Sequence, residues 1–163
     1  MILLLPGSAR ALGYELSAGA KLGRGQATAL QTGAELELAL ALDPQILVGM
    51  RAESGTRRAL QGWEPLHRAG LAAAWRFDRT RWMFRLGAAT GVEVGPAGGP
   101  GLWAGAALGL DHWPTPHRGM AYGLTLGYEL DLRSGAERIV LGLHLRVGGE
   151  AERRPEPSGR SAP

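Results

Sequence analysis

Hydrophobic and polar positions alternate along most of this chain with a period of two. In residues 14–22, Tyr14, Leu16 and Leu22 share one parity, whereas Glu15 and Lys21 share the other. Successive side chains of a β-strand point to opposite faces, so this period predicts strands and not helices. Seven further runs alternate in the same way. The eight predicted strands are residues 14–22, 30–42, 46–53, 68–77, 82–94, 102–111, 120–132 and 139–147.

Short links between most of the predicted strands favour an antiparallel, up-and-down order. Asp43-Pro44, residues 78–80 and the region around Pro114 carry turn signals. Residues 54–65 form a longer polar stretch, and Gly95–Gly101 reads as a flexible loop. Parallel strands need long crossover connections, whereas antiparallel strands can be joined by hairpins. We therefore expect an all-β meander.

The two faces of these strands differ sharply in composition. One face collects Leu, Ile, Val, Trp, Phe and Tyr, and the other collects Gly and Ala with single charged residues. Two arrangements could use this pattern. A soluble barrel or sandwich would turn the apolar face inward, whereas a membrane barrel would turn it toward lipid.

Glycine favours the membrane arrangement. The chain contains 26 Gly in 163 residues, and many of them, such as Gly49, Gly91 and Gly127, fall on the second face. Glycine weakens a strand that faces water. Inside a narrow eight-stranded barrel, however, small residues leave space for the few long side chains that fill the interior. We therefore expect an eight-stranded antiparallel up-and-down transmembrane β-barrel.

The distribution of charge favours the same arrangement. No charged residue lies on the apolar face within the eight runs, and one placed at mid-membrane would cost about 2–4 kcal/mol. Charges of both signs on the second face predict an ion-pair network, because an unpaired buried charge is costly. The predicted lumen network consists of Glu15, Lys21, Glu35, Glu37, Arg51, Glu53, Arg68, Arg76, Arg85, Glu93, Asp111, Glu129, Asp131, His144 and Arg146.

Aromatic residues and link lengths predict an orientation. Interfacial aromatics are typical of membrane barrels, as are short periplasmic turns and longer outer loops. With both termini on the inner side, the short links become inner turns, and the two longer links lie outside. Tyr128 and Trp103 are the nearest candidates for an outer girdle, although Trp103 has the parity of the inward face. The predicted inner girdle consists of Tyr14, Trp75, Phe77, Trp82, Phe84 and Tyr122.

The two ends of the chain fall outside the alternating pattern. Residues 1–11 read MILLLPGSARA, and small residues at Ala9 and Ala11 predict the remnant of a secretory signal peptide. Residues 12–148 are the predicted barrel. Residues 149–163 are rich in Pro, Gly and charge, so we expect a disordered C-terminal tail.

Composition excludes several other classes. The absence of cysteine excludes disulfide scaffolds, Cys-ligated zinc and thiol catalysis. No apolar run reaches 18 residues, so a transmembrane helix is not expected. The formal charge is +3 without a basic block, which argues against a nucleic-acid partner. His67, His112 and His117 lack metal-ligand spacing, so we expect no metal and no cofactor.

With this pattern, the chain resembles the eight-stranded outer-membrane β-barrel proteins of the OmpA/OmpX-like superfamily, over Leu12–Val147. The resemblance implies a monomer in the outer membrane of a Gram-negative cell, with its termini in the periplasm. It also implies outer-membrane lipid and the outer-membrane assembly machinery as partners. Members of this family often end in an aromatic residue that this machinery reads, whereas here the last strand ends at Val147 and a polar tail follows.

The functional expectation is a structural or surface-associated, non-enzymatic role. Eight strands leave an interior filled by side chains, so an open porin is not expected. The alternative is a soluble, lipocalin-like barrel that binds a small apolar ligand. A third reading is a lipid A-modifying enzyme that uses His144, oriented by Glu129 or Asp131, although the spacing places no serine within reach of it.

Overall fold

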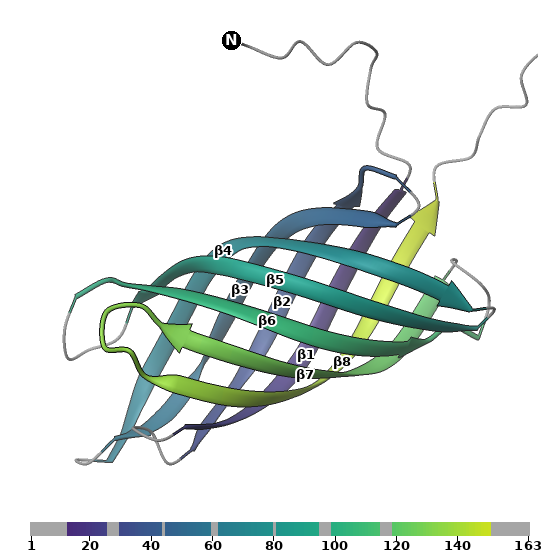
Figure 1. The fold of residues 1–163 in the computed structure, drawn as a ribbon. Helices are drawn as coiled ribbons and strands as arrows, with labels where there is room; N and C mark the ends of the chain where they lie inside the picture. The colour runs from purple at the N-terminus through teal and green to yellow at the C-terminus, as the bar shows by residue number, and fades with distance from the viewer. Residues whose placement is uncertain are drawn as a thin grey trace, which may run out of the picture.

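The computed structural model describes residues 13–25, 30–43, 45–59, 62–79, 81–94, 99–114 and 119–150. The predicted signal remnant and residues 151–163 of the predicted tail lie outside this part of the chain. Eight strands form the described structure (Figure 1). They are β1 (Gly13–Gly25), β2 (Gln31–Ala41), β3 (Ile46–Ala59), β4 (Gly62–Arg79), β5 (Trp82–Val94), β6 (Gly101–His112), β7 (Gly119–Asp131) and β8 (Glu137–Glu150).

The strands form a closed antiparallel barrel. Each strand pairs with the next one along the chain, and β8 pairs with β1 from Gly13↔Glu150 to Gly25↔Arg138. Closure gives every strand two hydrogen-bonded neighbours and removes the exposed edges of an open sheet. Gly149 and Glu150, which the sequence assigned to the tail, are the last residues of β8. No helix able to cross a bilayer occurs among the described residues.

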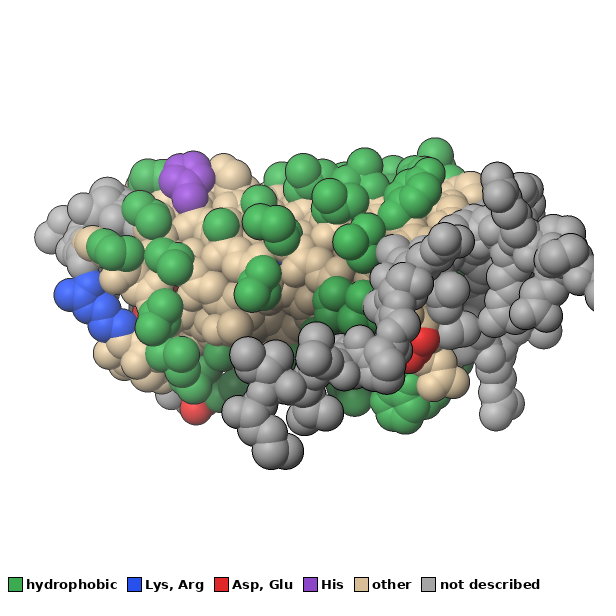
Figure 2. All heavy atoms as spheres, turned by 90° about the horizontal axis from the view of Figure 1, so that it is seen from above, with side chains coloured by type: hydrophobic (Ala, Val, Ile, Leu, Met, Phe, Trp, Pro, Cys, Tyr) green, Lys and Arg blue, Asp and Glu red, His purple; other side chains and the backbone are tan. Residues whose placement is uncertain are grey.

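The apolar face of the barrel points outward. Met50, Leu71 and Leu108 are 68%, 65% and 62% exposed, whereas Arg68 and Asp111 are buried inside. On the side seen in Figure 2, hydrophobic side chains cover the middle of the barrel, and coloured charged side chains appear toward its two ends. This is the inverse of a water-soluble barrel, which buries its apolar face.

The prediction of a polar loop over residues 54–65 is wrong. β3 and β4 continue through this stretch and pair as far as Arg58↔Trp63 and Ala59↔Gly62, so only residues 60 and 61 separate them. Pairing depends on backbone hydrogen bonds, and these form whether the outer side chains are polar or apolar. Gly62 has a φ of 130°, which residues with a side chain rarely adopt.

The predicted contrast between short inner links and long outer links is therefore wrong at β3–β4. This link belongs to the end away from the termini, yet it is as short as the β4–β5 link at residues 80–81. The start of β1 and the end of β8 lie at the same end of the barrel (Figure 1). We call this the terminal end and the opposite one the distal end.

Candidate functional site

The lumen holds a connected set of charged side chains. Near the terminal end, Glu15 on β1 accepts hydrogen bonds from Arg76 on β4 at 2.8 Å and from Arg85 on β5 at 2.5 Å. Asp111 on β6 contacts His144 Nε2 at 2.5 Å and Arg146 Nε at 3.1 Å, both on β8. Strand parity brings these groups together, because every one of them lies on the inward face. They form the terminal ion cluster.

A second group, the distal ion cluster, is centred on Lys21 and Arg68. Lys21 Nζ lies 2.6 Å from Glu35, 3.1 Å from Glu53 and 3.2 Å from Glu129. Arg68 contacts Glu93 at 2.7 Å and Glu129 at 2.5 Å, and it lies 3.6 Å from Glu53. These acids come from β2, β3, β5 and β7. The cluster therefore ties together strands on opposite sides of the lumen.

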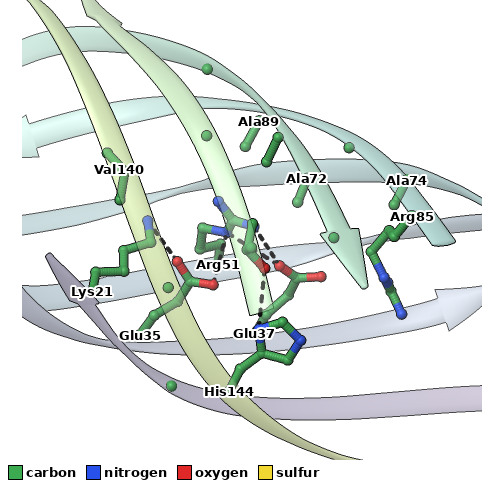
Figure 3. Close-up of a pocket in the computed structure, with 18 of the residues that line it drawn as sticks. Lys21, Glu35, Glu37, Arg51, Ala72, Ala74, Arg85, Ala89, Val140 and His144 are labelled. Atoms are coloured by element: carbon green, nitrogen blue, oxygen red, sulfur yellow. Dashed lines mark hydrogen bonds and ion pairs between the residues drawn. The ribbon is translucent and has the colours of Figure 1, made fainter. Parts of the chain in front are cut away.

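Arg51 on β3 connects the two clusters. It lies 3.6 Å from Glu35 in the distal cluster and 2.8 Å from Glu37. Glu37 in turn lies 4.0 Å from Arg146 in the terminal cluster. Figure 3 shows Lys21, Glu35, Arg51 and Glu37 as one chain of contacts along the lumen wall. Charges of alternating sign thus run through much of the length of the barrel.

Sequence reasoning missed three members of the distal ion cluster. Arg57 and Arg138 both pair with Glu93, at 2.6 Å and 3.2 Å. Gln31 donates to Glu53 at 2.8 Å and accepts from Arg138 at 2.9 Å. Arg138 has the parity of His144 and Arg146, and that signal could have found it. Arg57 lies within residues 54–65, for which the sequence predicted a polar loop and therefore no inward parity.

Asp131 differs from the other predicted lumen residues. It ends β7, and its Oδ1 accepts hydrogen bonds from the backbone amides of Arg133 at 2.9 Å and Ser134 at 3.2 Å. No ion pair within 4.0 Å is found for Asp131 among the described residues. Its carboxylate closes the β7–β8 turn, a common role of Asp at the start of a turn, so it lies at the distal edge of the network and outside the ion pairs of the two clusters.

Small side chains form the facing wall of the lumen. β4, β5 and β6 contribute Ala72, Ala74, Gly87, Ala89, Gly105 and Ala107. Between this wall and the charged wall lies a cavity of about 50 Å³, part of which is seen in Figure 3. A water molecule needs about 10–15 Å³ of such space and several polar partners. The cavity therefore has room for a few waters beside the ion pairs, and not for a solute stream.

Large side chains close the lumen on both sides of this cavity. Toward the distal end, the ring of Trp103 is 1% exposed and lies 5.3 Å from the guanidinium of Arg68. Trp103 was a candidate for an outer girdle, and that candidacy is wrong because its inward parity holds. Toward the terminal end, Met83, Trp113 and Ala121 pack together as a buried apolar cluster. Large side chains therefore flank the cavity toward both ends of the described lumen.

His144 is held inside the network. Its Nε2 contacts Asp111 and its Nδ1 contacts Thr125 Oγ1 at 3.1 Å. Neither Glu129 nor Asp131 orients it, contrary to the enzyme reading, because Glu129 contacts Lys21 and Arg68 instead. No serine takes part in its hydrogen bonds among the described residues. His144 therefore lacks the contact with a serine nucleophile that acyl chemistry would require.

The predicted interface aromatics lie outside the barrel near its terminal end. Trp75 and Phe77 have ring centroids 4.0 Å apart, and the His112 ring lies between those of Trp82 at 4.6 Å and Tyr122 at 5.2 Å, tilted against both. Amphipathic rings of this kind prefer the boundary between lipid and water. The six aromatics, 42–55% exposed, are Tyr14, Trp75, Phe77, Trp82, Phe84 and Tyr122.

Among the described residues, no group of three or more His, Cys, Asp or Glu is placed to hold a metal ion.

Closure, strand number and the outward apolar face together define the class: an eight-stranded transmembrane β-barrel. Solved structures of outer-membrane barrels share this fold. Neisserial surface protein A (NspA) is 14% identical with a TM-score of 0.66, covering 83% of this chain and 95% of its own. The N-terminal barrel domain of Pseudomonas aeruginosa OprF is 14% identical with a TM-score of 0.53, covering 81% and 96%.

A third similar structure is Ail, the attachment invasion locus protein of Yersinia pestis. It is 13% identical with a TM-score of 0.54, covering 84% of this chain and 98% of Ail. No protein-family model matches the chain, and no curated protein sequence matches it. The likeness therefore lies in the fold, which agrees with the resemblance to OmpA/OmpX-like barrels noted from the sequence.

Proposed function

We propose that this protein is an integral outer-membrane β-barrel with a structural or surface-associated, non-enzymatic role. The observation that carries the proposal is the position of the two faces. Apolar side chains such as Leu71, Leu108 and Leu143 are more than 60% exposed along the barrel, whereas the lumen charges are buried and paired. Water would penalise so large an apolar surface, whereas a bilayer accommodates it.

We infer a structural role and not a transport role from the side chains that occupy the lumen. The ion clusters, Trp103 and the Met83–Trp113–Ala121 cluster occupy its cross-section. The lipocalin-like alternative requires the apolar face to line an internal ligand cavity, and the outward position of that face argues against it. The enclosed position of His144 argues in the same way against a lipid-modifying activity.

The proposed location is the outer membrane of a Gram-negative cell, with the termini in the periplasm. The shared fold with NspA, OprF and Ail supports the outer membrane. The orientation rests on the common position of the first and last strand ends, beside the exposed aromatics. Outer-membrane lipid and the assembly machinery are the proposed partners, and the proposed state is a monomer.

Cell fractionation and gel mobility test this proposal. The protein is expressed behind a working signal peptide, and membranes are separated before samples are run boiled and unboiled. We expect the protein in the outer-membrane fraction, with a mobility that changes on boiling because the closed barrel resists detergent until heated. Recovery as a soluble protein without detergent would contradict the proposal and would favour the lipocalin-like alternative.

An arginine on the outer face provides a quantitative check. Leu126 is 54% exposed on β7 and pairs with Leu108 and Leu141, in the middle of the barrel. In lipid vesicles, Leu126→Arg is expected to lower the free energy of unfolding by about 2–4 kcal/mol, because a charge at mid-membrane loses its hydration. The measurement is urea unfolding followed by tryptophan fluorescence.

The matched control is Leu132→Arg. Leu132 is 51% exposed, but it lies in the β7–β8 turn beyond the strand. We expect a change within about 0.5 kcal/mol there, as for an ordinary surface substitution. Equal, small effects at both positions would mean that Leu126 does not face lipid.

A further inference from the structure

The outside of the barrel changes from apolar to polar at the distal ends of β1–β4. Ala34, Ala52 and Ala69 lie on β2, β3 and β4 where polar side chains begin to enter the outward positions. Beyond them, hydroxyl, imidazole and guanidinium groups share the outward positions with Leu30, Pro65 and Trp63, which is 54% exposed and pairs with Arg58. We name this surface the outer polar patch, and it consists of Arg24, Thr32, Ser54, Thr56, Arg58 and His67.

The two arginines of the patch differ from the arginines of the lumen. Arg24 and Arg58 are exposed, and no ion pair with a carboxylate of the described residues involves either of them. Arg68, Arg76, Arg85 and Arg138, by contrast, all pair with lumen acids. An arginine left without an internal counter-ion retains its full positive charge and all five donors for an external group.

Strand register places the two arginines in one row. Gly23 pairs with Gln31, so Arg24 lies beside Leu30, and the backbone N–H of Arg58 donates to Leu30 O at 2.8 Å. Leu30 therefore separates them across β1, β2 and β3. Two strand spacings amount to about 10 Å between their backbones, a gap that two long side chains can span to reach one headgroup.

The rest of the patch adds donors and no acid. Thr32 and Thr56 hydroxyls lie 3.3 Å apart, and Ser54 Oγ lies 3.1 Å from His67 Nδ1. No Asp or Glu occupies an outward position of β1–β4 in the described part of the chain; Glu64, on β4, faces Arg57 instead. A surface with cations, hydroxyls and no carboxylate is suited to an anion.

We propose that the outer polar patch binds the phosphate groups of anionic lipid headgroups in the outer leaflet. This inference rests on the proposed outer-membrane location and distal-out orientation. Arginine forms paired, charge-assisted hydrogen bonds to phosphate, which makes it well suited to this role. The adjoining apolar surface below the patch places its donors where lipid chains end and headgroups begin.

The test measures retention of lipid by the purified full-length barrel in detergent. Native mass spectrometry compares lipid A, which carries phosphates, with chemically dephosphorylated lipid A. Each basic residue near an anionic surface contributes about 1 kcal/mol, which corresponds to about fivefold in affinity. We expect Arg24→Gln and Arg58→Gln each to weaken retention of lipid A about fivefold, and the double variant about thirtyfold. Retention of the dephosphorylated lipid is expected to stay unchanged.

Arg81→Gln is the matched control, because Arg81 is an exposed arginine in the β4–β5 turn at the terminal end. It is expected to retain lipid A as the unaltered protein does. Equal retention of both lipids, or an effect of Arg81→Gln as large as that of the double variant, would overturn the proposal. Displacement of lipid A by millimolar inorganic phosphate would also overturn it, because the site would then bind free anions. If the barrel fractionates with the outer membrane but fails this test, the lipid-binding inference is wrong and the proposed function still stands.

Discussion

Glu93→Gln is expected to lower the free energy of unfolding by about 3–5 kcal/mol. Glu93 is 6% exposed, and its carboxylate is shared by Arg57 at 2.6 Å, Arg68 at 2.7 Å and Arg138 at 3.2 Å. Glutamine keeps the shape of the side chain but removes the charge, so three guanidinium groups remain near one another with less compensation. Loss of one partner from a buried pair typically costs this much.

Glu64→Gln is the matched control for this prediction. Glu64 also pairs with Arg57, but at 3.5 Å and with 22% of its side chain exposed. Solvent screens such pairs, so we expect a loss of at most about 1 kcal/mol. Both variants are unfolded in urea from lipid vesicles. Equal losses in the two variants would mean that the three arginines around Glu93 do not depend on its charge.

Gly91→Ala is the second change with a large expected effect. A Cβ at Gly91 would overlap Ala69 O and the Cα of Gly70, its cross-strand partner. Both obstacles are backbone, so β4 and β5 would have to separate and strain their ladder. Overpacking typically costs about 1–3 kcal/mol. We expect a loss at the upper end of this range, with a smaller folded fraction on an unboiled gel.

Gly87→Ala on the same strand and face provides the comparison. The nearest atom to a Cβ at Gly87 is Ala73 O at 3.6 Å, an ordinary contact, and the residue borders the lumen cavity. Alanine also restricts the unfolded chain, which can stabilise a protein by about 0.4–1 kcal/mol where the backbone permits it. We therefore expect no loss. A Gly87→Ala variant as unstable as Gly91→Ala would contradict the close-approach argument.

Side-chain parity accounts for what the sequence could predict. Glu15, Arg85 and Asp111 share the inward parity of their strands, and each is buried in the structure. Trp103 obeys parity as well, because it is 1% exposed and lies inside the lumen. Alternation is a local property of a strand, so it survives without knowledge of the partner strands.

Register and closure account for what the sequence could not predict. Arg68 meets Glu129 across the lumen from β4 to β7, a contact that depends on the geometry of the closed barrel. The extension of β3 and β4 past Ser54 could not be predicted because most outward residues there, such as Thr56, Arg58 and His67, are polar, and polar runs are typical of loops. Asp131 had inward parity, but a strand end also offers its carboxylate the amides of a turn.

The central claim is that the apolar face meets lipid. The chain has no cysteine, so a single introduced cysteine can carry a spin label in reconstituted vesicles. The test variant is Leu108→Cys on β6, at a position that is 62% exposed. The aqueous reference is Leu132→Cys in the β7–β8 turn. Oxygen concentrates in the bilayer, whereas a nickel chelate remains in water. We predict that the label at position 108 collides with oxygen and is shielded from nickel, and that the label at position 132 shows the reverse. Equal access of nickel to both positions would contradict the account.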